Sequence, residues 1–552
     1  MNPVNVAAHL PLLAQGRPHA PAVILQQGMQ RYRTHSFEEL NRLSDAYAAG
    51  LEAYGVRRGM RAALMVKPSL EFFGLVFALF KSGTVPVLID PAIGARSLKH
   101  CLEVSAPEAF IGISKAHAAR VLFGWGKRSI KKLVTAGPRL FWGGRSLAGI
   151  RREGERRRAF AMPAVDPDET AAILFTSGST GSPKGAVYSH ANFSAQVEAL
   201  RETYAIEPGE VDLATFPLFA LFGPALGMTA LVPDMDPTRP ARADPARLVA
   251  AIQKWNATNL FGSPALIDRL ARYGEAHGVK LPSLKRALSA GAPVPPATVR
   301  RFQSMLAEGV QLFTPYGATE ALPVCSIGSA EILGETAEAT RQGHGICVGR
   351  PVRGMQVRIV KISDEPIAAW SDELLAPPGA VGEIAVQGAA VTHAYFNRAD
   401  ATALAKIPDP YGGSFWHRMG DLGRLDAQGR VWMCGRKSHR VATPEGERYS
   451  VPCEGIFNAH PSVFRTALVG VGPRGAQRPV LCVELEREVP ADAERIRREL
   501  LDLGAQHEQT RAIREILFHP AFPVDIRHNA KIFREKLAEW AAERLGAGSA
   551  RR

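Results

Sequence analysis

One segment of the chain combines the residue types that bind phosphate. The stretch Thr176-Ser-Gly-Ser-Thr-Gly-Ser-Pro-Lys184-Gly185 follows an apolar run, residues 171–175, without a gap. Its hydroxyls, glycines and backbone N–H groups can surround phosphate oxygens, and Lys184 adds a cation. The spacing differs from that of the P-loop in nucleoside triphosphatases. A serine- and glycine-rich surface turn is the alternative, but such a turn needs neither the lysine nor the preceding apolar strand.

Six further segments place charged or aromatic residues beside glycines, and they follow the loop in one order along the chain. They are Leu288-Ser-Ala-Gly-Ala-Pro293, Tyr316-Gly-Ala-Thr-Glu320, Gly382-Glu-Ile-Ala-Val-Gln-Gly388 (running on to Tyr395), Trp416-His-Arg-Met-Gly-Asp421-Leu-Gly-Arg-Leu-Asp426, Gly435-Arg436-Lys437 and Asn529-Ala-Lys531-Ile-Phe-Arg534. Together with the loop, these segments resemble the motifs of the acyl-adenylate-forming superfamily. That superfamily contains acyl-CoA synthetases, luciferases and the adenylation domains of peptide synthetases, and the similarity covers nearly the whole chain.

The resemblance implies that ATP and Mg²⁺ activate a carboxylic acid as its acyl-adenylate, with release of pyrophosphate. Two anions must then be brought together, and a magnesium ion supplies much of the neutralising charge. By resemblance Glu320 holds the metal, while Lys531 bridges the carboxylate and the α-phosphate and stabilises charge in the transition state. The catalytic residues that the resemblance implies are Lys184, Thr319, Glu320 and Lys531.

The same resemblance assigns the nucleotide subsite. Asp421 should accept hydrogen bonds from both ribose hydroxyls, since one carboxylate can take two donors, and Arg436 should contact the ribose or a phosphate. The other residues expected to bind ATP or AMP are Thr176, Ser177, Gly178, Ser179, Thr180, Gly181, Gly291, Ala292, Pro293, Tyr316 and Gly317. A surface ion pair is the alternative for Asp421 and Arg436, and a solvated lysine in a basic helix is the alternative for Lys531.

An uncharged stretch indicates the kind of acid. Relatives that activate amino acids carry an aspartate for the substrate ammonium, whereas residues 215–227 hold no charge, and a buried ammonium without a partner is costly. The stretch predicts an apolar tunnel for an alkyl chain, lined by Phe216, Phe219, Ala220, Phe222 and Gly223; ordinary core packing is the alternative. Ala220 stands where the superfamily has a histidine, which leaves room for a substrate branched beside its carboxylate.

The segment after residue 435 departs from the superfamily pattern. Ser438 replaces an Asp or Lys, and residues 441–448 replace a loop that admits pantetheine in thioester-forming relatives, so coenzyme A use is in doubt. With residues 216–224 and 233–237, this segment resembles the β-lactone synthetases of bacterial long-chain olefin biosynthesis. Such enzymes adenylate a 2-alkyl-3-hydroxy fatty acid, whose hydroxyl then expels AMP. His190 and His439 are candidate bases for that hydroxyl, with a structural role as the alternative for each.

Two other functions stay open. A medium- or long-chain fatty acyl-CoA synthetase would share the fold and the first half-reaction. A non-catalytic acyl-binding scaffold is more remote, because Lys184, Glu320, Asp421 and Lys531 are all present. A hydrolase is weaker still, since the chain has no Gly-x-Ser-x-Gly segment.

The pattern of elements predicts an α/β protein. Helical segments alternate with short apolar runs from about residue 36 to 430, which favours layers around mainly parallel strands; Ser36 and Glu39 form a potential capping box. Residues 355–434 read as short strands with glycine turns. The resemblance implies a large N-terminal domain, residues 1–435, of layered α/β subdomains plus a β-barrel-like subdomain. A small mobile α+β lid, residues 436–552, would carry Lys531.

Composition excludes several other classes. The longest apolar runs, such as residues 72–80, are too short to span a membrane, and the first residues lack a signal-peptide pattern, so we expect a cytoplasmic protein. The six cysteines are scattered without zinc-binding spacing, and we expect them to be reduced and mostly buried.

Positive charge is concentrated in one region. Residues 112–160 carry thirteen of the 67 lysines and arginines but two acidic residues, and they include Phe123, Trp125, Phe141 and Trp142. The basic region 115–158 therefore predicts contact with protein partners of the same hydrocarbon pathway or with a membrane surface. The enzyme would then be peripheral to a membrane or part of a multienzyme assembly. A solvated basic insertion with its aromatics folded inward is the alternative, and nucleic acid is not an expected partner.

Overall fold

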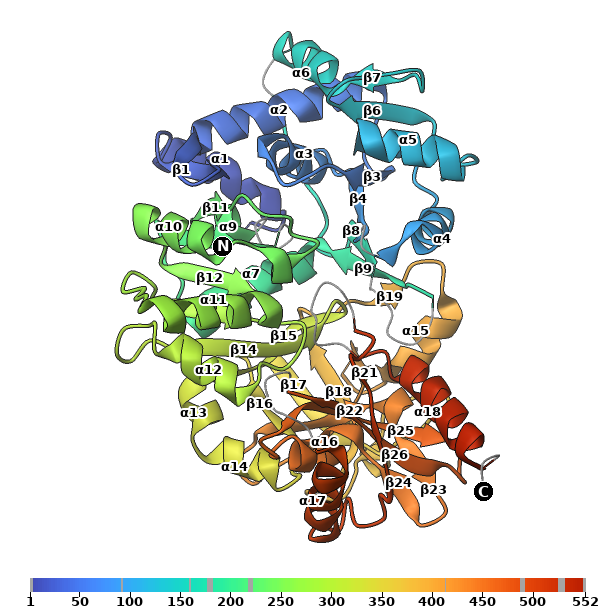
Figure 1. Cartoon of the computed structure of the whole chain (residues 1–552). Coiled ribbons are helices and arrows are strands. Elements are labelled where there is room, and N and C mark those ends of the chain that lie inside the picture. The colour runs from blue at the N-terminus through green and yellow to red at the C-terminus, as the bar shows by residue number, and fades with distance from the viewer. Residues whose placement is uncertain are drawn as a thin grey trace.

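The computed structural model describes residues 3–90, 93–157, 160–175, 182–216, 222–412, 414–486, 492–524 and 532–549. Figure 1 shows the N-terminal elements in blue at the top, the central sheet in green and yellow below them, and the C-terminal elements in orange and red at the bottom. The predicted α/β class is confirmed, with helices packed on large sheets.

The upper sheet has eight strands in the described part of the chain, and its central strands run parallel. In spatial order they are β19 (Ala394–Tyr395), β9 (Gly185–Ser189), β8 (Thr170–Phe175), β4 (Val85–Leu88), β3 (Arg61–Met65), β5 (Ala109–Ile113), β6 (Lys132–Ala136) and β7 (Arg145–Ser146). The helices from the same part of the chain are α2 (Phe37–Tyr54), α3 (Leu70–Lys81), α4 (Ala95–Ser105), α5 (Ser114–Phe123), α6 (Leu147–Glu155) and α7 (His190–Tyr204).

The second sheet has fourteen strands among the described residues. Its order is β17 (Met355–Val360), β18 (Gly382–Gly388), β21 (Ser414–Leu425), β22 (Val431–Arg436), β16 (Ile346–Pro351), β15 (Ala321–Gly328), β14 (Leu312–Ala318), β13 (Arg286–Ser289), β12 (Asn259–Gly262), β10 (Val211–Ala214), β11 (Thr229–Val232), β1 (Pro21–Gln27) and β2 (Arg31–Ser36), with β20 (Lys406–Asp409) paired to β21. From β1 to β14 the strands are parallel, whereas β14 to β22 pair antiparallel. The helices between these strands are α9 (Phe222–Ala225), α10 (Pro245–Trp255), α11 (Pro264–His277), α12 (Pro296–Gln303), α13 (Ser329–Leu333), α14 (Glu335–Arg341) and α15 (Ala399–Ala405), and α1 (His9–Gly16) precedes β1.

A smaller group of elements follows β22. It contains the hairpin β23 (Val441–Thr443) and β24 (Gly446–Arg448), a sheet of β25 (Val463–Val471), β26 (Arg478–Leu485) and β27 (Glu515–Phe518), and the helices α16 (Ser450–Phe457), α17 (Ala493–Ala505) and α18 (Arg534–Ser549). Arg534 at the start of α18 pairs with the buried Glu454 of α16 at 2.6 Å. Arg534, the last residue of the C-terminal motif, is thereby tied to the first helix after the predicted domain boundary at residues 435 and 436.

Local sequence signals account for several element boundaries. Ser36 caps α2 by accepting from the backbone N–H of Glu39, and the Glu39 side chain accepts from Ser36, so the predicted capping box is confirmed. The apolar run of residues 72–80 is the buried helix α3. It is hydrophobic nearly all round because it packs inside the protein, where a surface helix would keep a polar face.

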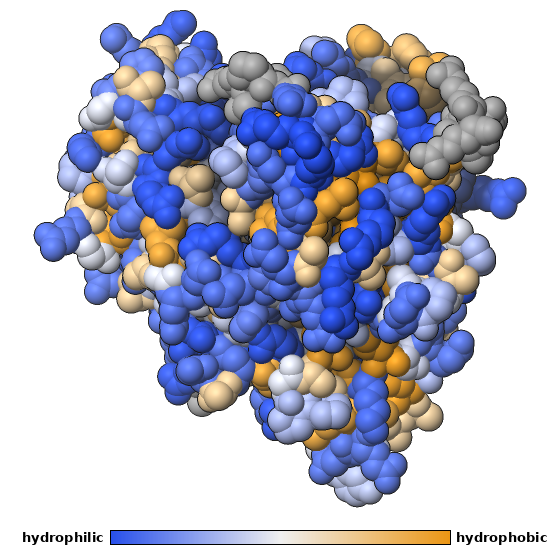
Figure 2. Space-filling model, turned by 60° about the horizontal axis from the view of Figure 1, so that its bottom comes forward, coloured by the Kyte–Doolittle hydropathy of each residue, from blue (hydrophilic) through white to orange (hydrophobic). Residues whose placement is uncertain are grey.

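One face of the molecule is shown in Figure 2. Hydrophilic residues cover most of the face in Figure 2, and hydrophobic residues show between them in separate areas. Within the described ranges, no helix is both long and apolar enough to cross a bilayer. All six cysteines are buried free thiols, which confirms their predicted burial; burial raises the pKa of Cys101 to about 12, so it is an inert core residue.

Candidate active site

Two hydrogen bonds join the eight-stranded sheet to the loop between β14 and β15. The hydroxyl of Tyr188 on β9 donates to the backbone carbonyl of Thr319, and the hydroxyl of Tyr395 on β19 donates to Oε1 of Glu320 at 2.6 Å. β19 pairs with β9 in the same sheet. The predicted catalytic loop therefore lies where the two sheets meet, and each sheet contributes to its position.

The backbone holds Glu320 in a tight turn. Ala318 and Ala321 pair across the β14–β15 hairpin, and the Glu320 carbonyl accepts from the backbone N–H of Thr392 at 2.8 Å. A side chain at Gly317 would come within 2.5 Å of the Ala321 carbonyl, so only glycine fits before the turn. The positions of Thr319 and Glu320 are thus set by main-chain contacts.

Lys184 and Glu320 both contact the side chain of Tyr395. The ammonium of Lys184, directly before β9, lies 5.0 Å from the centre of the Tyr395 ring, and the same tyrosine donates to Glu320. Burial, together with the Glu320 carboxylate, raises the pKa of Tyr395, so its phenol stays protonated and remains a hydrogen-bond donor. The structure brings together these two residues, which the sequence separates widely.

A second cluster contains three of the residues that we expect to bind the nucleotide. Tyr316 donates to Oδ2 of Asp421 at 2.7 Å, and Nη1 of Arg436 lies 3.1 Å from Oδ1. Asp421 and Arg436 are register partners on β21 and β22. Burial raises the pKa of Asp421, and Arg436 and Tyr316 oppose that rise. A buried carboxylate with two partners on one side can still accept ligand hydroxyls on the other.

The turn of residues 291–293, which we expect to bind ATP or AMP, follows β13. Gly291 has a φ of 100°, a conformation that L side chains rarely adopt, and Ala292 and Pro293 continue the turn into α12. These residues lie at the carboxyl end of a parallel strand, which is where open α/β sheets bind ligands.

The described residues also fit a magnesium ion. Magnesium keeps several waters and takes one or two protein carboxylates besides phosphate oxygens, and Glu320 has one oxygen, Oε2, without a contact to Tyr395. In the described ranges no group of three or more His, Cys, Asp or Glu side chains could hold a metal by themselves. The donor set therefore fits a metal that arrives with nucleotide phosphates.

Some predicted residues lie outside the described ranges. They are Thr176, Ser177, Gly178, Ser179, Thr180, Gly181, Phe219, Ala220 and Lys531. Of the predicted acyl pocket, Phe216 and Phe222 pack partly buried against the main core, with Phe216 6.3 Å from Phe261, and Gly223 is buried in α9. These contacts agree with a pocket wall and equally with core packing.

The two candidate bases have different surroundings. His190 is buried against Phe80, and its charged neighbours are Glu169 and Arg58, while burial lowers its pKa. His439 lies 3.4 Å from Glu535 at the start of α18. Neither contact involves a predicted catalytic residue.

The structure adds three residues that the sequence motifs did not single out as site residues. Tyr395 joins Lys184 to Glu320, as described above. Lys406 and His417 are paired across β20 and β21, both buried, and Lys406 donates to the carbonyl of Thr392. Burial lowers the pKa of Lys406 to about 7 against the opposing charge of Glu320. A lysine and a histidine on adjacent strands give no local signal, because burial depends on the packing of distant segments.

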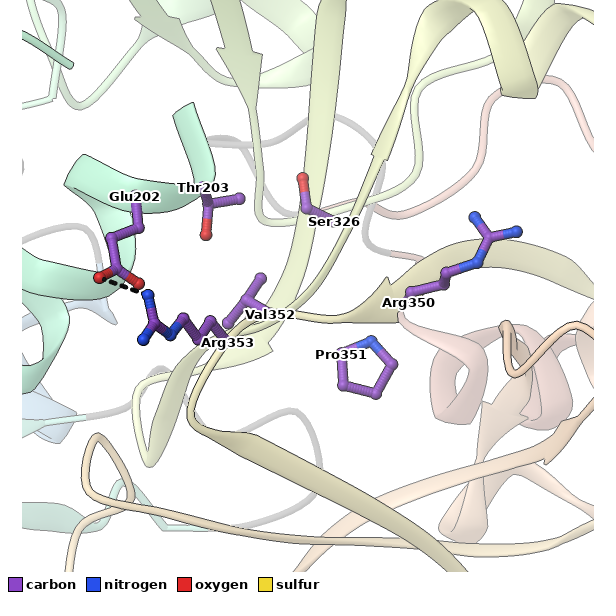
Figure 3. A pocket seen from close by; sticks show the side chains of 7 residues that line it. All are labelled: Glu202, Thr203, Ser326, Arg350, Pro351, Val352 and Arg353. Atoms are coloured by element: carbon purple, nitrogen blue, oxygen red, sulfur yellow. Dashed lines mark hydrogen bonds and ion pairs between the residues drawn. The ribbon is translucent and has the colours of Figure 1, made fainter. Parts of the chain in front are cut away.

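A hollow of about 640 Å³ lies elsewhere, between the end of α7 and strands β15 and β16 (Figure 3). It is lined by Glu202, Thr203, Ser326, Arg350, Pro351, Val352 and Arg353. Its described lining contains none of the predicted site residues, and an ion pair of 3.1 Å between Arg353 and Glu202 stands at one side. We do not assign it to the nucleotide or the acid.

Residues 12–396 match the AMP-binding enzyme family, and the chain belongs to that family. The matched range contains Lys184, Thr319 and Glu320, whose arrangement is described above.

Two curated relatives share about half of their residues with this chain. The chain is 51% identical to the olefin beta-lactone synthetase of Stenotrophomonas maltophilia, over 98% of this chain and 99% of that protein. It is also 51% identical to the olefin beta-lactone synthetase of Xanthomonas campestris, over 98% of each. A long-chain-fatty-acid–CoA ligase of Escherichia coli is 25% identical over 83% of this chain and 82% of the ligase.

Solved structures show the same fold. ATP-bound MatB from Rhodopseudomonas palustris superposes with a TM-score of 0.78 at 20% identity, covering 98% of this chain and 99% of that one. An amide bond synthetase from Marinactinospora thermotolerans gives a TM-score of 0.77 at 22% identity, covering 97% and 99%. At this identity the likeness supports the fold and leaves the reaction to other evidence.

Proposed function

We propose that the protein activates a 2-alkyl-3-hydroxy long-chain fatty acid with ATP and closes the resulting acyl-adenylate to a β-lactone in olefin biosynthesis. The observation that carries this proposal is the 51% identity to two olefin beta-lactone synthetases over 98% of the chain. The cluster around Glu320 and Asp421 supports it, because that cluster offers the groups that an adenylating enzyme needs.

The first step joins two anions. A carboxylate oxygen of the acid attacks the α-phosphorus of ATP, and the bond from that phosphorus to the leaving diphosphate breaks. We assign Lys184 to the phosphates and Lys531 to the carboxylate and α-phosphate, because fixed cations stabilise charge that grows in the transition state. A magnesium ion, when bound, adds positive charge at the phosphates; Glu320 would hold it, and Thr319 would contact a phosphate.

Other residues would orient the nucleotide. Asp421 would accept from the ribose hydroxyls, and the phenol of Tyr316 together with Arg436 keeps its carboxylate in place. The turn at Gly291, Ala292 and Pro293 would flank the adenine, while Thr176–Gly181 would surround the phosphates. For the alkyl chain we propose the wall formed by Phe216, Phe219, Ala220, Phe222 and Gly223.

The second step is intramolecular. The 3-hydroxyl oxygen attacks the acyl carbon, the bond to AMP breaks, and the hydroxyl proton leaves to a base. The mixed anhydride is needed because a strained four-membered ring requires a good leaving group. Well-oriented intramolecular groups reach effective concentrations of roughly 10⁵ M or more, so no external thiol is required.

The domain assignment belongs to the same proposal. Residues 1–435 would bind ATP and the acid, and residues 436–552 would form a lid that carries Lys531 into the cleft and then moves away. The ion pair of Glu454 with Arg534 would make α16 and the start of α18 move as one unit.

One experiment tests the reaction. The enzyme is incubated with ATP, magnesium and a 2-alkyl-3-hydroxy acid in the absence of any thiol, and the product is identified by mass spectrometry. We expect catalytic turnover to a lactone with one AMP and one diphosphate per product. The matched control is the same acid without its 3-hydroxyl, which should stop at the adenylate.

The alternative is a fatty acyl-CoA synthetase, in line with the 25% identical ligase. In that case the hydroxy acid would also accumulate as its adenylate, and only coenzyme A would discharge it. That result would contradict the lactone proposal while leaving adenylation intact.

A further inference from the structure

Exposed apolar side chains are concentrated in one short segment. Eleven large hydrophobic residues are exposed in the described part of the chain, and five of them lie within residues 121–141. These five, the apolar patch, are Val121, Leu122, Phe123, Leu140 and Phe141. Leu122 and Phe141 are the most open of them, with 78% and 79% of their surface exposed. Scattered single residues need no explanation, but a cluster of this kind marks an interaction surface.

Both parts of the apolar patch are fixed to the same helix. Val121, Leu122 and Phe123 form the last turn of α5. The loop that bears Phe141 is anchored by Trp142, whose ring stacks on His117 of α5 at 5.4 Å and whose indole N–H donates to Thr135 at 2.9 Å. Figure 1 shows α5, β6 and β7 together at the upper right corner of the molecule.

Buried tryptophans support exposed phenylalanines in both parts. Trp125 is buried and stacks on Phe123 at 5.7 Å, and Trp142 is buried and contacts Phe141 at 5.4 Å. The prediction that the aromatics of this segment fold inward thus holds for the two tryptophans and fails for the two phenylalanines. The phenylalanines extend outward because the tryptophans already fill the space against α5 and β6.

Exposed basic residues follow or flank both parts of the apolar patch in the sequence. Exposed Lys127, Arg128 and Lys131 follow Phe123, and exposed Arg139 and Arg145 flank the loop of Phe141. The two acidic residues within residues 112–160 already have partners, since Glu155 pairs with Arg151 at 2.7 Å and Glu153 pairs with Arg157 at 3.4 Å.

We propose that the apolar patch and its basic rim dock the enzyme on an anionic lipid bilayer. Aromatic and aliphatic side chains insert between head groups, while surrounding lysines and arginines attract the negative surface. An acidic protein partner would have to provide both negative charge and an apolar pocket for the leucine and phenylalanine side chains, and it is an outcome of the test below. The bilayer therefore fits both features of this surface, and the inference stands whether or not the lactone chemistry is correct.

Vesicle co-sedimentation tests the proposal on the full chain. The probes are phosphatidylcholine vesicles and phosphatidylcholine vesicles containing phosphatidylglycerol. We expect binding to the anionic vesicles that weakens as salt is raised, because salt screens exposed charges. The charge variant K127E/R128E/K131E should bind the anionic vesicles at least about a hundredfold more weakly, because three attractive charges are lost and three repulsive ones are added. The apolar variant L122S/L140S/F141S should lose about tenfold or more, with a smaller change in salt dependence.

A matched control carries the same kind of change far from the patch. R498E/R511E reverses two exposed arginines on or after α17, at the bottom of Figure 1, and Y411S removes the exposed Tyr411. Both should bind vesicles like the unmodified enzyme. Circular dichroism and adenylation of a short, water-soluble acid should be unchanged in every variant, because all the altered side chains are exposed.

Three results would overturn the proposal. The unmodified enzyme could fail to bind anionic vesicles at low salt, the two patch variants could bind as well as the controls, or binding could be equal on neutral vesicles and insensitive to salt. Capture of an acidic protein by this surface without vesicle binding would identify a protein interface in place of the membrane. Failure of the lactone assay would leave the vesicle result unaffected.

Discussion

Replacement of Asp421 by asparagine should weaken the binding of ATP without lowering the stability of the fold. Asparagine has nearly the same shape, so the change removes a charge and little volume. The carboxylate accepts from Tyr316 at 2.7 Å and lies 3.1 Å from Arg436, and we assign its remaining capacity to two ribose hydroxyls. A hydrogen bond to a charged acceptor contributes about 1 kcal/mol more than one to a neutral acceptor.

Two such bonds amount to about 2–3 kcal/mol of ATP binding, which corresponds to an increase of about 30- to 150-fold in the Kd for ATP. Stability should behave differently. Burial raises the pKa of Asp421 on folding, so its ionised form at neutral pH opposes folding. Arg436 keeps access to water, with 35% of its side chain exposed. We therefore expect the melting temperature of D421N to stay unchanged or rise.

Asp426, five residues further on, provides the matched control. Its carboxylate accepts from Arg430 at 2.7 Å and from Trp432 at 2.8 Å. Burial raises its pKa, but the hydrogen bonds from Trp432 and Arg430 outweigh that effect and leave the pKa lowered. Its stabilisation is thus fully present at neutral pH and is lost as the pH falls through the folded-state pKa. D426N should lose about 1–3 kcal/mol of stability and keep its affinity for ATP.

The assay is equilibrium binding of ATP to both variants, together with thermal unfolding at neutral pH. The reasoning fails if D421N binds ATP like the unmodified enzyme, or if its melting temperature falls as far as that of D426N. In either case Asp421 would be a structural carboxylate and the ribose assignment would be wrong.

Three further predictions concern Lys406, Tyr395 and Lys531. Lys406→Met should remove a pH dependence of stability. The pKa of Lys406 is about 7 in the folded protein and about 10.4 in the unfolded chain, so the unfolded chain binds more protons between these values and the unmodified enzyme gains stability from about pH 7 to 10. Denaturant unfolding at several pH values should show this gain for the unmodified enzyme and not for the variant. Tyr395→Phe frees the Glu320 carboxylate and should slow pyrophosphate exchange by about tenfold, with ATP affinity nearly constant; unchanged exchange would contradict its role. Lys531→Ala should abolish pyrophosphate release and leave ATP binding largely intact, and normal release would refute the lid assignment.

Local sequence signals predicted much of the framework. The capping box at Ser36 and Glu39 and the strand before Lys184 both depend on residues near each other in the chain, and the structure contains both. The collinear motifs predicted the family, and the match over residues 12–396 confirms it. The short strands predicted within residues 355–434 are also present, among them β18 and β22.

The sequence by itself determined which chemical groups the site can use, because residue types and their spacing are local properties. These groups are the hydroxyl-rich loop, Lys184, Glu320, Asp421 and Arg436. Only the tertiary structure decided which of these groups meet. Tyr395 joins Lys184 to Glu320 because β19 pairs with β9 across the chain. Lys406 has a lowered pKa because distant strands bury it, and Phe141 faces solvent because Trp142 occupies the space against α5. Pairing and burial are set by contacts between remote segments, and such contacts leave no periodic trace in the sequence.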